Sequence, residues 1–155
     1  MRHSGKHDRG FTLIEIVAVL IVIGIIGTAV TISSVYSTSA NNLAAQVEVI
    51  KGHLRYAQAR AMSSDAIWGI NFSSDTYFLF KNGNINDTVF LPAETSDSVT
   101  LPAGMTITVA TVSFDSWGKP YTDAAATAQG GADISVSLGG TSETISITNN
   151  TGFIP

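Results

Sequence analysis

The sequence has no cysteine, and charged residues make up only 13% of its 155 residues. An ordinary soluble domain has about 25% charged residues. The absence of cysteine excludes disulfides, thiolate zinc sites and cysteine nucleophiles. By contrast, 45% of the residues are hydrophobic, and much of this excess lies in one block near the amino terminus. The length suits one modest domain plus an anchor.

Basic residues are scarce in the distal part of the chain. From Asp65 onward there are nine acids and only two bases, Lys81 and Lys119. An acidic surface repels phosphate, so the electrostatic footprint of a nucleic-acid-binding protein is missing. The same charge argues against peripheral adhesion to anionic lipid. We therefore expect neither nucleic acid nor a lipid surface as the partner of this part.

The sequence also lacks the side chains of a recognisable catalytic site. Of the three histidines, only His53 lies beyond the first ten residues, at a position where we expect a solvated helix surface. No Ser-His-Asp set and no metal-ligand spacing can be built from one helical histidine. The acids of a loop-rich stretch, Asp87, Glu94 and Asp97, could bind calcium, but a solvated acidic loop explains them better. We predict no enzyme and no cofactor.

The apolar block runs from Phe11 to Ile32, 22 residues without a polar face. As a helix it would span roughly 33 Å at about 1.5 Å per residue, which matches a hydrocarbon core of about 30 Å. The flank before it carries Arg2, Lys6 and Arg9. The positive-inside rule then places the amino terminus in the cytoplasm and the rest of the chain outside.

Three interpretations of this block compete. A cleaved signal peptide would need a shorter apolar region, of about 7–15 residues, and a better cleavage site than Ser37-Thr-Ser-Ala40. A plain single-span anchor explains the length but leaves Glu15 without a purpose, although an acid inside a span costs about 2.5–3.5 kcal/mol. The third interpretation gives Glu15 a purpose and comes from a resemblance of the residues around it.

The segment Arg9-Gly10-Phe11-Thr-Leu-Ile-Glu15 resembles a type IV prepilin leader. The resemblance implies that prepilin peptidase cuts between Gly10 and Phe11 and methylates the new amino terminus at Phe11. The family's glutamate, the fifth residue after the cut, falls on Glu15. The implied cut would create a charged amine at Phe11 in an apolar environment. The Glu15 carboxylate, on the same or a neighbouring helix, could neutralise this amine and set the register of a filament. The implied partners are this peptidase, other pilin or pseudopilin subunits and the inner membrane.

Beyond the block, the residue pattern predicts a long helix followed by strands. An apolar stripe at three- and four-residue steps predicts that one helix runs from residue 11 to about 62, with a possible break at 33–42. After Asp65 the period changes to two. Glycine and asparagine at Lys81–Asn84 and Gly139–Thr141 predict hairpin turns, and Tyr121–Gly131 reads as a loop. The stripe comprises Leu43, Val47, Ile50, Leu54, Ala57 and Ala61; the expected strands are 67–72, 77–80, 89–91, 106–109, 112–114, 134–138 and 144–148.

Three later segments narrow the resemblance. Leu54–Ala66 is similar to the "AR-x-x-A" helix end of the GspH/FimT group, which comprises minor pseudopilins of type II secretion and related minor type IV pilins. Phe114-Asp-Ser-Trp-Gly118 and the end Ile145-Ser-Ile-Thr…Thr151-Gly-Phe-Ile154 resemble that group's "F-D-x-x-G" and "I-x-I…T-G" segments. The carboxyl end lacks the bases typical of DNA-uptake members. Asp115–Tyr121 also resembles a major-pseudopilin segment without its calcium acids, and we interpret it as a tight turn that packs Trp117 and Tyr121.

These observations predict an α+β, pilin-like fold in which a long helix packs on a small antiparallel sheet. The expected parts are a cleaved leader (1–10), a transmembrane and filament-core helix (11–32), its amphipathic continuation (33–64) and an extracytoplasmic β domain (65–155). The expected function is that of a structural subunit, a minor pseudopilin or pilin, of a secretion pseudopilus or a type IV pilus. It would be single-pass in the inner membrane before assembly. The alternatives are an anchored extracytoplasmic enzyme or binding domain and, among pilins, a major pilin or a DNA-uptake minor pilin.

Overall fold

The computed structural model describes residues 12–155, and of residues 27–38 it describes the backbone only. The chain divides into two compact units, residues 1–38 and 39–155. A single helix, α1 (Leu13–Ser64), occupies the described part of the first unit and continues into the second. Its helical backbone is unbroken through residues 33–42, so the suggested break there is wrong.

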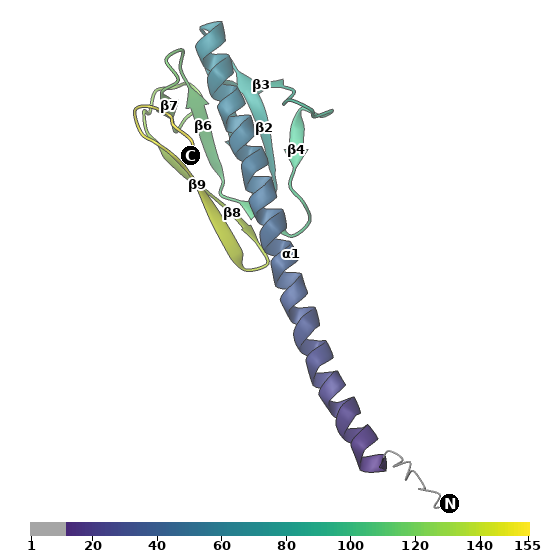
Figure 1. Cartoon of the computed structure of the whole chain (residues 1–155). Helices are drawn as coiled ribbons and strands as arrows, with labels where there is room; N and C mark the ends of the chain where they lie inside the picture. The colour runs from purple at the N-terminus through teal and green to yellow at the C-terminus, as the bar shows by residue number, and fades with distance from the viewer. Residues whose placement is uncertain (1–11) are drawn as a thin grey trace, which may run out of the picture. The chain divides into compact units, whose positions relative to one another are not determined.

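The strands of the second unit form two antiparallel sheets (Figure 1). The larger sheet has the order β3-β2-β1-β6-β7, and β4 pairs with the same strand β2 as β3 does. The smaller sheet has the order β5-β8-β9. The strands are β1 (Trp68–Phe72), β2 (Thr76–Lys81), β3 (Asn84–Val89), β4 (Ser98–Thr100), β5 (Met105–Ile107), β6 (Ala110–Phe114), β7 (Pro120–Tyr121), β8 (Ala132–Leu138) and β9 (Thr141–Ile147).

The core of the second unit lies between α1 and the two sheets. All six side chains of the predicted helical stripe are buried, with exposed fractions of 2% or less. They pack in one cluster with apolar side chains from both sheets, such as Ile70 and Leu79 from the larger sheet and Ile134 and Ile145 from the smaller. Burial of about 25 cal/mol per Å² of apolar surface makes this the main stabilising contact of the unit. The predicted α+β arrangement of a long helix on antiparallel strands is therefore confirmed.

Both predicted hairpin turns are present. Asn82 and Gly83 have φ of 56° and 65°, and Gly139 and Gly140 have φ of 59° and 84°. Two consecutive residues with positive φ are the signature of a type I′ turn, whose twist matches that of the flanking strands. The second turn fixes the register of β8 with β9 along the whole ladder, whereas the register of β2 with β3 shifts between Lys81 and Phe80, directly after the first turn.

The predictions for the edge strands were less accurate. The strand expected at 89–91 is instead β3, which ends at Val89, and β4 and β7 were not predicted. In β3 the first three residues are all exposed, and Ile85 is the only apolar residue before Val89, so the segment lacks the run of alternating apolar residues that marks a half-buried strand. Strands β4 and β7 have only three and two residues, and β7 begins with Pro120. Proline fits an edge strand because it has no backbone N–H to donate to a neighbouring strand.

Candidate assembly site

Gly10 and Phe11, where cleavage and methylation are predicted, lie outside the described residues. The description begins with Thr12, which caps α1. The Thr12 Oγ1 accepts a hydrogen bond from the backbone N–H of Glu15 at 3.3 Å, and the Thr12 carbonyl accepts from Glu15 and Ile16 at 3.1 and 3.3 Å. Threonine at the cap with glutamate three residues later is the sequence pattern of a capping box. The sequence analysis missed this second use of Glu15, although the pattern was readable.

Glu15 is exposed on a helix surface that is otherwise apolar. It is the only charged residue between Phe11 and Val47. A carboxylate in the first turn is favoured by the positive end of the helix dipole, by about 0.3–1 kcal/mol. This stabilisation by the helix dipole is small, so it leaves the Glu15 carboxylate able to pair with a positive charge from another molecule. The site thus offers one acceptor of a positive charge in an apolar setting.

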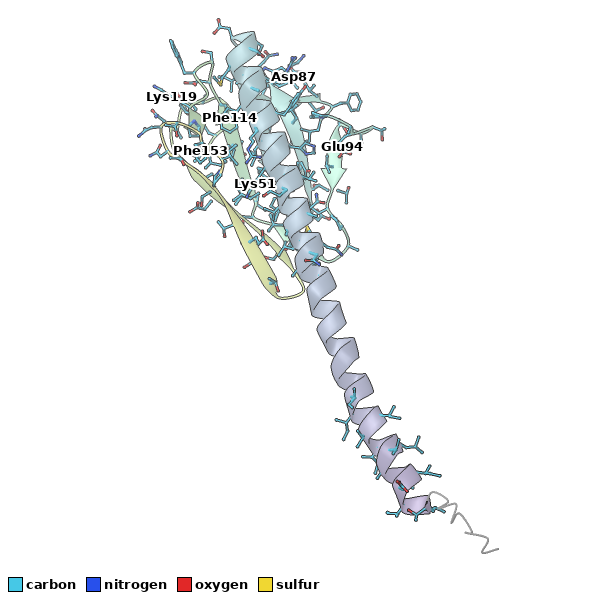
Figure 2. The ribbon with its side chains drawn as sticks, in the orientation of Figure 1. Lys51, Asp87, Glu94, Phe114, Lys119 and Phe153 are labelled. Carbon is cyan, nitrogen blue, oxygen red and sulfur yellow. The ribbon has the colours of Figure 1, made fainter. Side chains whose placement is uncertain are left out.

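Apolar side chains project from this first part of α1 in every direction (Figure 2). Each of them is between 41% and 81% exposed. An amphipathic helix would bury one face, whereas this part has no polar face apart from Glu15. An exposed apolar surface of this kind marks a contact with a partner or with lipid. The side chains are Leu13, Ile14, Ile16, Val17, Val19, Leu20, Ile21, Val22, Ile23, Ile25 and Ile26.

The predicted membrane-spanning segment, residues 11–32, extends beyond the residues whose side chains are described. Within those residues, no helix is both long enough and apolar enough to cross a membrane. The span therefore stays a prediction.

The three later segments of the sequence resemblance meet at Gln58 on α1. Its Nε2 donates to the carbonyl of Gly118 at 2.9 Å and to those of Gly152 and Thr151 at 3.1 and 3.4 Å. A Cβ on Gly152 would collide with the Gly118 carbonyl. Both glycines have a positive φ, 65° at Gly152 and 74° at Gly118. Arg55 adds a hydrogen bond to the Ile154 carbonyl at 3.1 Å. The helix thereby fixes the carboxyl end of the chain.

The turn at Asp115 is formed as predicted, but one of its aromatic residues is not packed. The Asp115 Oδ1 accepts from the N–H groups of Trp117 and Lys119, both at 2.9 Å, and its Oδ2 accepts from the Tyr121 hydroxyl at 3.1 Å. Trp117 is 80% exposed, so the expectation that it packs is wrong. Gly118, which follows Trp117 in this turn, has a positive φ of 74°.

His53 is buried, with an exposed fraction of 8%, so the expectation of a solvated position is wrong. Its Nδ1 lies 2.9 Å from the Tyr77 hydroxyl of β2. Burial holds the pKa of the imidazole below its usual value of 6.5, against the opposing influence of the Glu94 carboxylate and the Pro92 backbone. A helical spacing alone did not reveal this contact, because Tyr77 is 24 residues away in sequence.

The lowered pKa of His53 predicts that acid weakens the second unit. The unfolded chain binds a proton near pH 6.5, while the folded chain resists it, so stability is complete above pH 6.5 and falls as pH decreases below that value. The denaturant midpoint of the full-length chain should therefore decrease between pH 7 and pH 5. His53→Gln should flatten this dependence, and an unchanged slope in that variant would contradict the assignment to His53.

The acids considered for calcium do not converge on one site. Among the described residues, no group of three or more histidine or acidic side chains could hold a metal ion. Asp87 instead accepts a hydrogen bond from Asn82 at 2.8 Å, and Asp97 accepts one from Thr88 at 3.4 Å. The first contact stabilises the β2–β3 hairpin, and the second connects β3 to the segment just before β4.

Comparisons with known proteins bear on the amino-terminal segment and on the fold. Residues 5–31 match the family model of the prokaryotic N-terminal methylation motif, and the matched range includes Gly10, Phe11 and Glu15. The structure resembles the crystal structure of the type IV minor pilin FimU of Pseudomonas aeruginosa strain PAO1. The TM-score is 0.55 at 17% identity, over 76% of this chain and 90% of that one. No curated protein sequence matches the chain. The chain thus has a pilin-like fold behind a prepilin-type amino terminus.

Proposed function

We propose that this type IV pilin-like protein is a minor subunit of a filament, either a type II secretion pseudopilus or a type IV pilus. The observation that carries the proposal is the surface of α1 over residues 13–26, which is apolar on all sides except at Glu15. Such a surface is costly in water at about 25 cal/mol per Å² and requires lipid or other helices around it. The match of residues 5–31 to the methylation motif supports the same use.

The proposed mechanism has two steps. Prepilin peptidase cuts between Gly10 and Phe11 and methylates the amine of Phe11. In the filament this amine pairs with the Glu15 carboxylate of an adjacent subunit, while the apolar surfaces of the helices pack together. Either charge left unpaired in that environment would cost about 3–5 kcal/mol. The pair therefore sets the axial register of the helices.

Before assembly, the first part of α1 would anchor the chain in the inner membrane with the second unit outside the cytoplasm. The basic residues Arg2, Lys6 and Arg9 before the apolar block support this orientation. The second unit, whose surface is acidic from Asp65 onward, would face partner proteins rather than nucleic acid.

The proposal is tested by the amino-terminal mass of the mature full-length chain. We expect a chain that begins with methylated Phe11, because Gly10 precedes the motif's cleavage point. A mature chain that begins near Ala40 would instead be the product of an ordinary signal peptidase. A chain that retains Met1–Gly10 would support the alternative of a plain anchor on an extracytoplasmic enzyme or binding domain.

A further inference from the structure

Strand β9 forms one edge of the smaller sheet (Figure 1). All seven of its residues pair with β8, from Thr141 opposite Leu138 to Ile147 opposite Ala132. In the part of the chain that the structure describes, no strand pairs with its other edge. The chain after β9 folds back on itself, since the Thr148 N–H donates to the Phe153 carbonyl at 2.9 Å. That tail does not extend the sheet.

The turn geometry identifies which backbone groups of β9 are free. The two-residue turn Gly139-Gly140 makes Leu138 and Thr141 a closing pair that exchanges two hydrogen bonds. Hydrogen-bonded and non-hydrogen-bonded pairs then alternate along the ladder. Every second residue from Thr141 therefore directs its N–H and carbonyl toward β8. The residues that direct these groups away from the sheet are Ser142, Thr144 and Ser146.

The edge carries only one of the features that normally prevent pairing. Natural edge strands are protected by charged side chains, above all lysine, by proline, by a bulge or by a covering loop, and the one charged side chain of β9 is Glu143. The sequence Thr141-Ser-Glu-Thr-Ile-Ser-Ile147 has neither lysine nor proline, and its register with β8 runs without a shift. Its outward side chains are small hydroxyls, exposed at Ser142, Thr144 and Ser146. An edge seven residues long and open in this way fits an added strand.

We propose that β9 accepts an extended segment of a different subunit as an additional strand. This inference rests on the proposed function, because it assigns one contact between assembled subunits. Backbone hydrogen bonds would supply the affinity, and the side chains opposite β9 would supply the specificity. On the core side of β9, Ile145 is buried and Glu143 is exposed. The incoming strand should place an apolar residue opposite Ile145 and a basic residue opposite Glu143.

The same two residues argue against pairing with β9 of a second copy. In a two-fold antiparallel pair centred on Thr144, Glu143 of each copy would lie opposite Ile145 of the other. A carboxylate would then be placed against a buried apolar side chain without a partner, which is unfavourable. A heterologous strand with a basic residue avoids this.

Amide exchange of the full-length chain tests the proposal directly. In the assembled filament, the N–H groups of Ser142, Thr144 and Ser146 should exchange at least about 100-fold more slowly than in the unassembled chain in detergent. The N–H of Ile145, already bonded to β8, serves as the internal control and should change much less. Equal exchange of Thr144 in the two states would overturn the proposal.

Thr144→Pro removes the outward N–H without breaking a bond to β8, so the β8–β9 hairpin should persist. We expect at least a tenfold loss of incorporation into filaments. Thr144→Val, which keeps the N–H and loses the hydroxyl, should assemble normally. Protection of the Ile145 amide in the proline variant checks that the hairpin has folded; Glu143→Lys, which leaves the backbone intact, should also reduce incorporation. Normal assembly of Thr144→Pro and of Glu143→Lys would overturn the proposal.

Two further outcomes are distinguishable. The chain has no cysteine, so Thr144→Cys provides a single thiol for a short cross-linker. A cross-linked dimer of this chain alone would overturn the heterologous partner in favour of a second copy. Failure of the wild-type chain to enter any filament would contradict the proposed function itself. Assembly with an unprotected Thr144 amide would contradict only the added strand.

Discussion

Glu15→Leu should reduce incorporation of the chain into filaments by about 100-fold or more, while the amount in the membrane fraction stays at the wild-type level. The substitution leaves the Phe11 amine of a neighbouring subunit without its counter-charge. An unpaired charge in an apolar environment costs about 3–5 kcal/mol, and about 1.4 kcal/mol corresponds to a factor of ten. Membrane insertion should not suffer, because the variant removes a charge from an apolar helix.

The control for this experiment is Thr12→Ala, because Thr12 and Glu15 share the capping contact at the start of α1. Loss of the Thr12 cap should cost about 1 kcal/mol of helix stability and leave the Glu15 carboxylate in place. We expect this variant to assemble. If both variants fail equally, Glu15 acts through the helix start rather than through its charge, and the register mechanism is wrong. Quantification of the chain in sheared filaments and in membranes separates these results.

Leu54→Ala should destabilise the second unit by about 2–5 kcal/mol, which is the usual cost of removing a fully buried leucine side chain. Leu54 has an exposed fraction of 0% and lies in the cluster between α1 and the two sheets. The loss should appear as a lower urea midpoint of the full-length chain in detergent, with an unchanged slope.

Val49→Ala is the matched control for the packing of α1. Val49 lies on the same helix, five residues before Leu54, and is 45% exposed. Its truncation should change the free energy of unfolding by no more than about 0.5 kcal/mol. Equal losses in the two variants would mean that the stripe does not carry the contact between helix and sheets.

The sequence predicted the features that depend on local chemistry. A six-residue stripe at helical spacing identified the buried face of α1, and the pairs Asn82-Gly83 and Gly139-Gly140 identified both hairpin turns. The same reasoning failed for His53, which is buried beside Tyr77, 24 residues away in sequence. It also failed for Trp117, which is 80% exposed in the turn that Asp115 stabilises. Neither outcome leaves a periodic signal in the sequence.

The candidate site also has parts that the sequence indicated and parts that only the structure revealed. Residues 5–31 match a known motif, whereas the roles of Gly10, Phe11 and Glu15 stay predictions. The meeting of three distant segments at Gln58 was not predictable, because each segment is short and Gln58 reads as an ordinary solvated helix residue. The free edge of β9 became visible only when the order of the strands was known.

The central claim is that processing releases an amino-terminal helix that carries the chain into a filament. The most direct test is the amount of the wild-type chain and of its Gly10→Val variant, which blocks the predicted cut, in filaments purified from cells that make all the other subunits. The account predicts that the wild-type chain is present in these filaments and that the variant is absent from them and remains in the membrane. A wild-type chain that stays in the membrane, or an uncut variant that enters filaments, would contradict the account.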